Sequence, residues 1–136
     1  MENTSQIMYK INTEISPEDM SAVFKASGII RPSEDLQRLQ RMIDHADILI
    51  TAWVNDKIVG IARALTDYSY CCYLSDLAVD KEYQKAGIGK ELVRLVQEQI
   101  GEAVTLILLA SPIAMEYYPK IGFKKIENGF KIDRKS

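Results

Sequence analysis

The sequence predicts a single α/β domain built around a mixed β-sheet, and three observations indicate this class. The chain of 136 residues is long enough to bury roughly two-thirds of the surface that its unfolded form would expose. Short β-rich runs alternate with runs of helical period, in the order strand, two helices, three strands, helix, strand, helix, two strands. No internal repeat or linker-like stretch divides the chain. We therefore expect one domain over residues 1–136, with residues 1–6 as a loose N-terminal segment.

The first third of the chain is predicted to form one strand and two helices. The run IMYKINT (residues 7–13) alternates enough for a strand. Ser16 and Pro17 are typical of an N-cap and a first helical residue, and Gly28 is suited to end that helix. In SEDLQRLQRMIDHAD (33–47), apolar residues recur at three- and four-residue spacing, which predicts a second helix capped by Ser33.

The rest of the chain alternates strands with helices. ILITAWV (48–54) and KIVGIARAL (57–65) predict a hairpin that turns at NDK, and YCCYLSDLAV (70–79) predicts a third strand. A helix is expected at about 87–100, ended by Gly101. The apolar run AVTLILLA (103–110) is typical of a strand covered on both faces, and SPIAMEYYPK (111–120) of a short helix. The last expected element is a hairpin in which GFKKIE and FKIDR flank Asn128 and Gly129.

Composition and charge exclude several classes of protein. Hydrophobic residues make up 47% and charged residues 26% of the chain, as in globular domains rather than disordered ones. The net charge of -2 lacks the positive surplus that nonspecific nucleic-acid binding needs. No run approaches the roughly 20 apolar residues that span a bilayer, and the N-terminus has no signal-peptide pattern. We therefore expect a cytoplasmic protein without nucleic-acid or membrane partners.

Cysteine and histidine usage predicts neither a disulfide nor a metal site. Cys71 and Cys72 are adjacent, so in a strand they point to opposite faces and do not pair, which suits a reducing cytosol. The distant His45 does not complete a metal-ligand cluster with them. Both cysteines are expected to be buried strand residues rather than nucleophiles.

The stretch DKEYQKAGIGKEL (80–92) places Gly87 and Gly89 at the start of a predicted helix, just beyond the carboxyl end of a strand. The first turn of a helix has free backbone N–H groups that attract anions, and glycine lets phosphate oxygens approach the backbone closely. Each glycine costs about 1 kcal/mol relative to alanine, whereas a hydrogen bond to a charged group contributes about 1.5–3 kcal/mol. Lys85 and Lys90 add positive charge. These residues support two interpretations equally, a pyrophosphate site or a tight turn packed against the sheet.

The wider segment LAVDKEYQKAGIGKELV resembles the central motif of the GCN5-related N-acetyltransferase (GNAT) family, and Gln84, Gly87 and Gly89 match its pattern. Downstream, ASPIAMEYYPKIGFKKI is similar to the family's second motif. Its matching residues are Tyr117, Tyr118, Gly122 and Phe123. The two motifs span about residues 73–126. The resemblance implies a GNAT-like fold with a mostly antiparallel central sheet flanked by helices, and acetyl-CoA as cosubstrate without a metal.

The resemblance also implies roles for individual residues. Leu77, Ala78 and Val79 would present backbone groups to the pantetheine arm of the coenzyme. The pyrophosphate would be bound by the stretch Gln84, Lys85, Ala86, Gly87, Ile88, Gly89 and Lys90. Ser111 matches a position at which many relatives bind the coenzyme, although as the cap of the helix before Pro112 it has a simpler explanation.

Tyr118 is the one predicted catalytic residue, because it matches the family's tyrosine that protonates the departing thiolate. Tyr117 matches a usually apolar position and is expected to be a core aromatic residue. The general base stays unassigned, since neither Tyr73 nor Ser75 is a convincing base. Strand alternation points Asp76 to the other face, where it would be structural unless a bulge redirects it.

The acceptor side is less specified by sequence. Residues 31–34 lie between the first two helices, a segment that borders the acceptor in the resembled family. Trp53 and the tyrosines nearby (Tyr68, Tyr70 and Tyr73) are expected mainly to pack, with an acceptor pocket as the alternative.

The sequence therefore predicts an acetyl-CoA-dependent N-acetyltransferase that transfers the acetyl group to a primary amine by direct attack in a ternary complex. The acceptor would be a small-molecule amine or a protein or peptide amine, and a homodimer stays open. A noncatalytic acyl-CoA-binding or regulatory domain on the same scaffold is the alternative, because no base is evident.

Overall fold

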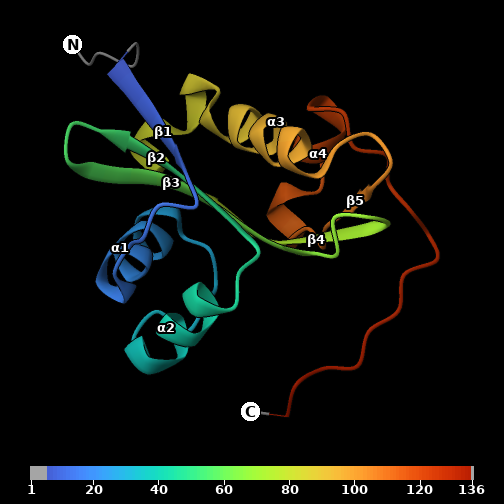
Figure 1. Ribbon diagram of the computed structural model, residues 1–136, viewed down its shortest axis with the longest axis horizontal. Helices are drawn as coiled ribbons and strands as arrows, with labels where there is room; N and C mark the ends of the chain where they lie inside the picture. The colour runs from blue at the N-terminus through green and yellow to red at the C-terminus, as the bar shows by residue number, and fades with distance from the viewer. Residues whose placement is uncertain (1–5, 136) are drawn as a thin grey trace.

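The computed structural model describes residues 6–135, and its central feature is a five-stranded sheet in the order β1-β2-β3-β4-β5 (Figure 1). The strands are β1 (Ile7–Ile11), β2 (Ile48–Val54), β3 (Lys57–Thr66), β4 (Cys71–Val79) and β5 (Thr105–Ile107). β1 to β4 pair in antiparallel fashion with their neighbours, and β5 pairs parallel to β4. The expected α/β class with a mixed, mostly antiparallel sheet is confirmed. The expected loose segment falls largely on residues 1–5, which lie outside the described residues.

Helices cover both faces of the sheet, as Figure 1 shows. On one face lie α1 (Pro17–Ser27) and α2 (Leu36–Asp44), which bury Met20, Val23, Phe24 and Leu39 against the sheet. On the other face α3 (Ile88–Ile100) buries Ile88, Leu92, Val93 and Val96. Burial of each such apolar side chain contributes about 1.5–3 kcal/mol to folding. The sheet is therefore held between two apolar layers.

The ends of α1 follow the sequence signals. The Ser16 hydroxyl accepts a hydrogen bond from the Asp19 amide at 3.0 Å, and the Asp19 side chain accepts in return from the Ser16 amide. Gly28 ends the helix at φ 83°, a conformation that favours glycine. The predicted cap of α2 is wrong, because Asp35 rather than Ser33 accepts the hydrogen bond from the Arg38 amide at 3.1 Å. Serine and aspartate both suit an N-cap, so the cap could be assigned only once the first residue of the helix was known.

The C-terminal third departs most from expectation. The run 103–110 forms a strand only at Thr105–Ile107, and it is covered on one face: Leu106 packs on the core while Ile107 is 40% exposed. β5 is an edge strand, and its outer neighbour is missing because the expected C-terminal hairpin does not form within residues 122–135. Phe130 and Ile132 are each 97% exposed, and a two-stranded hairpin that packs against nothing else is at best marginally stable. The C-terminal segment runs away from the sheet (Figure 1).

Candidate functional site

The candidate site begins where β4 and β5 separate. The two strands pair only from Cys71–Thr105 to Tyr73–Ile107, whereas β4 continues to Val79 with β3 as its partner. Alternate peptide groups of a strand point to opposite neighbours, so the edge of residues 74–79 that faces away from β3 has backbone groups without a strand partner. Leu77, Ala78 and Val79 lie on this free edge, where the sequence predicts backbone contacts with a pantetheine arm.

The free edge leads directly to the start of α3. A short 3-10 helix, η2 (Lys81–Ala86), follows β4, and Gly87 then turns the chain into α3 at φ 78°. The first intrahelical bond of α3 joins the Glu91 amide to the Gly87 carbonyl oxygen at 3.1 Å. The amides of Ile88, Gly89 and Lys90 therefore have no partner within the helix and point outward at its N-terminus. This end can bind an anion through backbone groups alone.

The two glycines are required for different reasons. A Cβ on Gly87 would meet no atom within 4 Å, so its positive φ is what requires glycine. A Cβ on Gly89 would lie 2.4 Å from the Tyr117 hydroxyl oxygen, so this position needs glycine for space. The packing role that the sequence allowed for Gly89 is therefore present, and it concerns a tyrosine from a distant segment rather than the sheet.

The expectation that Tyr117 is a core aromatic residue is therefore wrong. It begins α4 (Tyr117–Lys120), its side chain is 37% exposed, and its hydroxyl lies against the first turn of α3. Burial of part of the ring raises the pKa of this hydroxyl, so Tyr117 is neutral near pH 7. The hydroxyl group of Tyr117 was the sequence signal against a core position. A fully buried tyrosine needs a hydrogen-bond partner for its hydroxyl.

The remaining predicted coenzyme contacts are mostly exposed side chains. Gln84, Lys85 and Lys90 are exposed around the turn, and the Gln84 amide donates to the Val79 carbonyl oxygen at 3.0 Å. Ser111 occupies the N-cap position of η3 (Pro112–Ala114), but its side chain makes no capping hydrogen bond. The expectation that side-chain capping explains Ser111 is therefore wrong, and its backbone carbonyl oxygen accepts the first bond of the short helix, from the Ala114 amide at 2.9 Å.

Tyr118 is half-buried in a small aromatic cluster. Its ring packs edge-on against Tyr117 and Phe123, with centroids 5.3 and 5.5 Å apart. Burial raises the pKa of the Tyr118 hydroxyl above its ordinary value of 10.0, Tyr117 adds to this effect, and the Arg31 charge opposes it. The hydroxyl is therefore protonated near neutral pH and able to donate a proton, and the charge of Arg31 acts on it.

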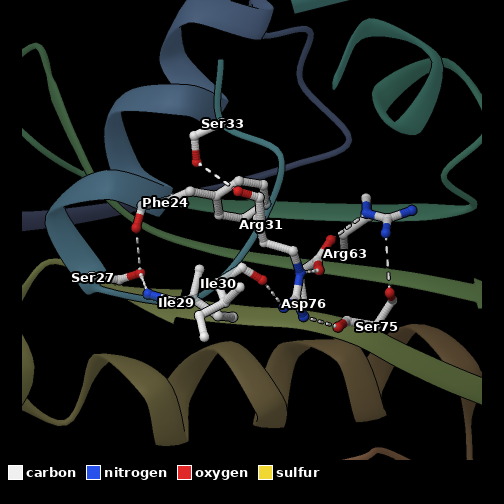
Figure 2. A network of polar contacts seen from close by, with 9 residues as sticks. All are labelled: Phe24, Ser27, Ile29, Ile30, Arg31, Ser33, Arg63, Ser75 and Asp76. Carbon is white, nitrogen blue, oxygen red and sulfur yellow. Dashed lines mark hydrogen bonds and ion pairs between the residues drawn. The ribbon is translucent and has the colours of Figure 1, made fainter. Parts of the chain in front are cut away.

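A buried charged cluster lies on the opposite side of β4 from α3 (Figure 2). The Asp76 carboxylate is fully buried and binds two arginines, with Oδ1 accepting from Arg31 Nε at 2.5 Å and Oδ2 accepting from Arg63 Nε. The β3–β4 register shifts between Arg63 and Ala64, which leaves Ser75 as a bulge without a Cα partner. Because of this bulge, Leu74 packs toward α3 and Asp76 points toward Arg31.

The predicted orientation of Asp76 by simple alternation is therefore wrong, and the bulge that the sequence left open is present. Both carboxylate oxygens are engaged, which leaves Asp76 as a structural residue and not a free base. Cys72 is buried as expected, whereas Cys71, Tyr68 and Tyr70 are exposed, contrary to expectation. Among residues 6–135, no cluster of three or more potential metal ligands occurs. The same part of the chain has no helix with the length and apolar character to cross a membrane.

Comparison with known proteins identifies the family of the chain. The profile of the acetyltransferase (GNAT) domain matches residues 12–133. The chain belongs to the GNAT family. A chloroplast GCN5-related N-acetyltransferase of Arabidopsis thaliana is 25% identical over 137 residues, which are 96% of this chain and 68% of that protein. An uncharacterized N-acetyltransferase of Pyropia yezoensis is 33% identical over 79 residues, which are 57% of this chain and 45% of that protein. The chain thus spans less than half of the second relative.

Solved GNAT structures share this fold. A GNAT-family acetyltransferase of Streptococcus pneumoniae superposes with a TM-score of 0.74 at 24% identity, covering 95% of this chain and 99% of that one. An aminoglycoside N-acetyltransferase solved in complex with CoA has a TM-score of 0.71 at 17% identity, covering 96% of this chain and 95% of that one. At these identities the likeness shows the fold alone. In the GNAT domain described here, the roles of the individual site residues stay predictions.

Proposed function

We propose that this GNAT domain is an acetyl-CoA-dependent N-acetyltransferase that transfers the acetyl group directly to a primary amine. One observation carries the proposal: β4 loses β5 as a partner at Tyr73, so its free edge extends from the bulge at Ser75 to the N-terminus of α3. An extended amide-containing arm can bind such an edge as an added strand does. Its phosphates would then reach the free amides of Ile88, Gly89 and Lys90.

The transfer itself needs two contributions from the protein, a donor to the developing oxyanion and a proton for the leaving thiolate. The amine nitrogen attacks the thioester carbonyl carbon and loses one proton to water, the C–S bond breaks, and the thiolate takes a proton. A backbone N–H on the free edge, that of Leu77 or a neighbour, would stabilise the developing oxyanion. Such a donor contributes about 10²–10³-fold in rate. Tyr118 would donate the proton to the thiolate, a role that contributes about 10²–10⁴-fold.

No side chain is assigned as the general base, and water takes the proton that the acceptor nitrogen loses. Asp76 is held by two arginines, and Tyr118 is reserved for the opposite proton transfer. A neutral amine is therefore selected from solution, and the rate should rise with pH toward the pKa of the acceptor. The aminoglycoside-acetylating neighbour supports the inclusion of amino sugars among candidate acceptors, beside polyamines, amino acids and peptide lysines.

Two measurements test this function in sequence. Calorimetry with acetyl-CoA, desulfo-CoA and NADH should detect micromolar binding of the first two and none of NADH. A thiol-release assay over the amine panel should then show acetylation of at least one class of acceptor. Binding of acetyl-CoA without thiol release from any acceptor would favour the noncatalytic acyl-CoA-binding domain, and absence of CoA binding would exclude both functions.

A further inference from the structure

One side chain ties the segment between α1 and α2 to the centre of the sheet. Arg31 lies in this segment and donates from Nε to Asp76 and from Nη2 to the Ser75 carbonyl oxygen at 2.8 Å (Figure 2). It also donates from Nη1 to the carbonyl oxygen of its neighbour Ile30 at 2.7 Å. A planar guanidinium can hold a carboxylate and a carbonyl group at once through donors in a fixed arrangement, whereas the three donors of a lysine rotate about a point charge on a flexible stem.

Both arginines donate hydrogen bonds to Ser75, the bulge residue of β4. Its carbonyl oxygen accepts from Arg31, and its hydroxyl accepts from Arg63 Nη2 at 3.0 Å. Ser75 follows closely after Tyr73, the last β4 residue that pairs with β5, and precedes Leu77 on the free edge. The hydrogen bonds from Arg31 and Arg63 therefore act at the point where β4 leaves β5. They constrain the orientation of the peptide groups that follow Ser75.

Stability alone does not explain why three charges are placed here. The Asp76 side chain is 0% exposed, and those of Arg63 and Arg31 are 10% and 28% exposed. Well-packed apolar residues often replace a buried ionic cluster without loss of stability. Apolar residues, however, cannot donate a hydrogen bond that orients the carbonyl group of a bulge residue. The Arg31 charge also reaches Tyr118, whose pKa it lowers against the effect of burial.

We propose that Arg31 is a positioning residue for acyl transfer, which fixes the β4 bulge through Asp76 and the Ser75 carbonyl group and thereby aligns the backbone N–H groups of the free edge with the thioester. The inference rests on the proposed function. It assigns no contact between Arg31 and the reacting atoms. It requires that loss of the Arg31 fork alters the geometry at Ser75 to Leu77 while the N-terminus of α3 keeps its structure.

The test compares Arg31→Met and Arg31→Lys with the wild-type protein, and Lys25→Met serves as the matched control. Lys25 forms an exposed ion pair with Glu34 of the same segment at 2.9 Å, without contact to β4. Because small misplacements of reacting groups cost up to about 10²-fold in rate, Arg31→Met should lower kcat about 10–100-fold. The dissociation constant for acetyl-CoA should stay within about twofold, since α3 supplies the anchoring donors. Arg31→Lys should recover much of the thermal stability but little of kcat, and Lys25→Met should match the wild type.

Hydrogen–deuterium exchange of the free proteins gives a second measurement that does not need an active enzyme. In Arg31→Met and Arg31→Lys, amides of residues 28–35 and 74–77 should exchange faster, with those of 88–91 unchanged. The inference is overturned if exchange at 74–77 is unchanged, or if kcat and acetyl-CoA affinity fall together in proportion to lost stability. A wild-type protein that acetylates no amine would instead overturn the proposed function, and the exchange result would still decide whether Arg31 fixes the bulge.

Discussion

The two ends of the free β4 edge are built in contrasting ways. At the α3 end the donors are backbone amides, and the only specialised residues are Gly87 and Gly89, one for its φ of 78° and one for the space that Tyr117 fills. At the bulge end the backbone is held by buried charged side chains, with Asp76 bound to Arg31 and Arg63. The difference teaches that an anion site can depend on the absence of side chains, whereas the irregular strand depends on their presence. Substitutions at the two ends should therefore fail differently.

The largest effect is expected at the charged end. Asp76→Asn leaves two arginines beside a neutral amide, and removal of one member of a buried ion cluster typically costs about 3–5 kcal/mol. Urea unfolding should show a loss of unfolding free energy of this size. Asp44→Asn is the control, because its exposed carboxylate accepts only from Gln40 on the same helix. A loss below about 1 kcal/mol for Asp76→Asn would contradict a desolvated cluster.

Tyr118→Phe should affect chemistry rather than binding. Loss of a proton donor should lower turnover about 10²-fold at saturating substrates, with acetyl-CoA affinity nearly unchanged. Since burial raises the pKa of the hydroxyl, the donor form persists as pH rises and is lost only above about pH 10, so the wild type should lose this contribution there and the variant should not. Tyr117→Phe is the control and should keep turnover. Unchanged turnover in Tyr118→Phe would remove Tyr118 from the mechanism.

Gly89→Ala should affect binding rather than stability. The methyl group gains about 1 kcal/mol of helix propensity but meets the Tyr117 hydroxyl, so the net change in stability should be small. Displaced groups at the first turn of α3 should weaken acetyl-CoA binding about tenfold, which corresponds to one weak charge-assisted hydrogen bond.

The double variant Gly89→Ala/Tyr117→Phe separates the two causes of weakened binding. Without the hydroxyl, the nearest ring atom to the new methyl group is Cζ at 3.4 Å, so the close contact is relieved. Calorimetry should still show weak acetyl-CoA binding if the methyl group itself obstructs the phosphate. Full recovery of affinity would indicate that only the tyrosine matters.

The last effect, a change in stability of similar size, is expected at Gly87, where alanine meets no neighbour but must adopt a positive φ. The cost should be about 1–2 kcal/mol of unfolding free energy, measured by urea unfolding. Gly129→Ala is the matched control, since its surroundings are also open and its φ is not positive. Equal changes in the two variants would contradict a conformational role for Gly87.

The contrast between the two ends also explains what sequence could predict. Ser16, Pro17 and Gly28 act on adjacent residues, so the bounds of α1 were predictable, and the glycine spacing at 87–89 located the start of α3 for the same reason. Local sequence signals did not predict structure at positions whose conformation involves residues far away in sequence. Ser75 in the bulge is hydrogen-bonded by Arg31 and Arg63, which lie 44 and 12 residues away in sequence. The expected hairpin at Asn128 and Gly129 had suitable turn residues, but within the described residues its Phe130 and Ile132 pack against no other element.

The short pairing of β4 with β5 also fixes a length. From Leu74 to Val79 the free edge spans six residues at about 3.3 Å each, or about 20 Å. Under the proposed function, an acyl donor would have to separate its reacting carbon from its phosphates by a comparable distance to bind both ends at once. Donors with a truncated arm would fill one end only, so the register at which two parallel strands stop pairing would select the acyl donor by size before any side chain contacts it.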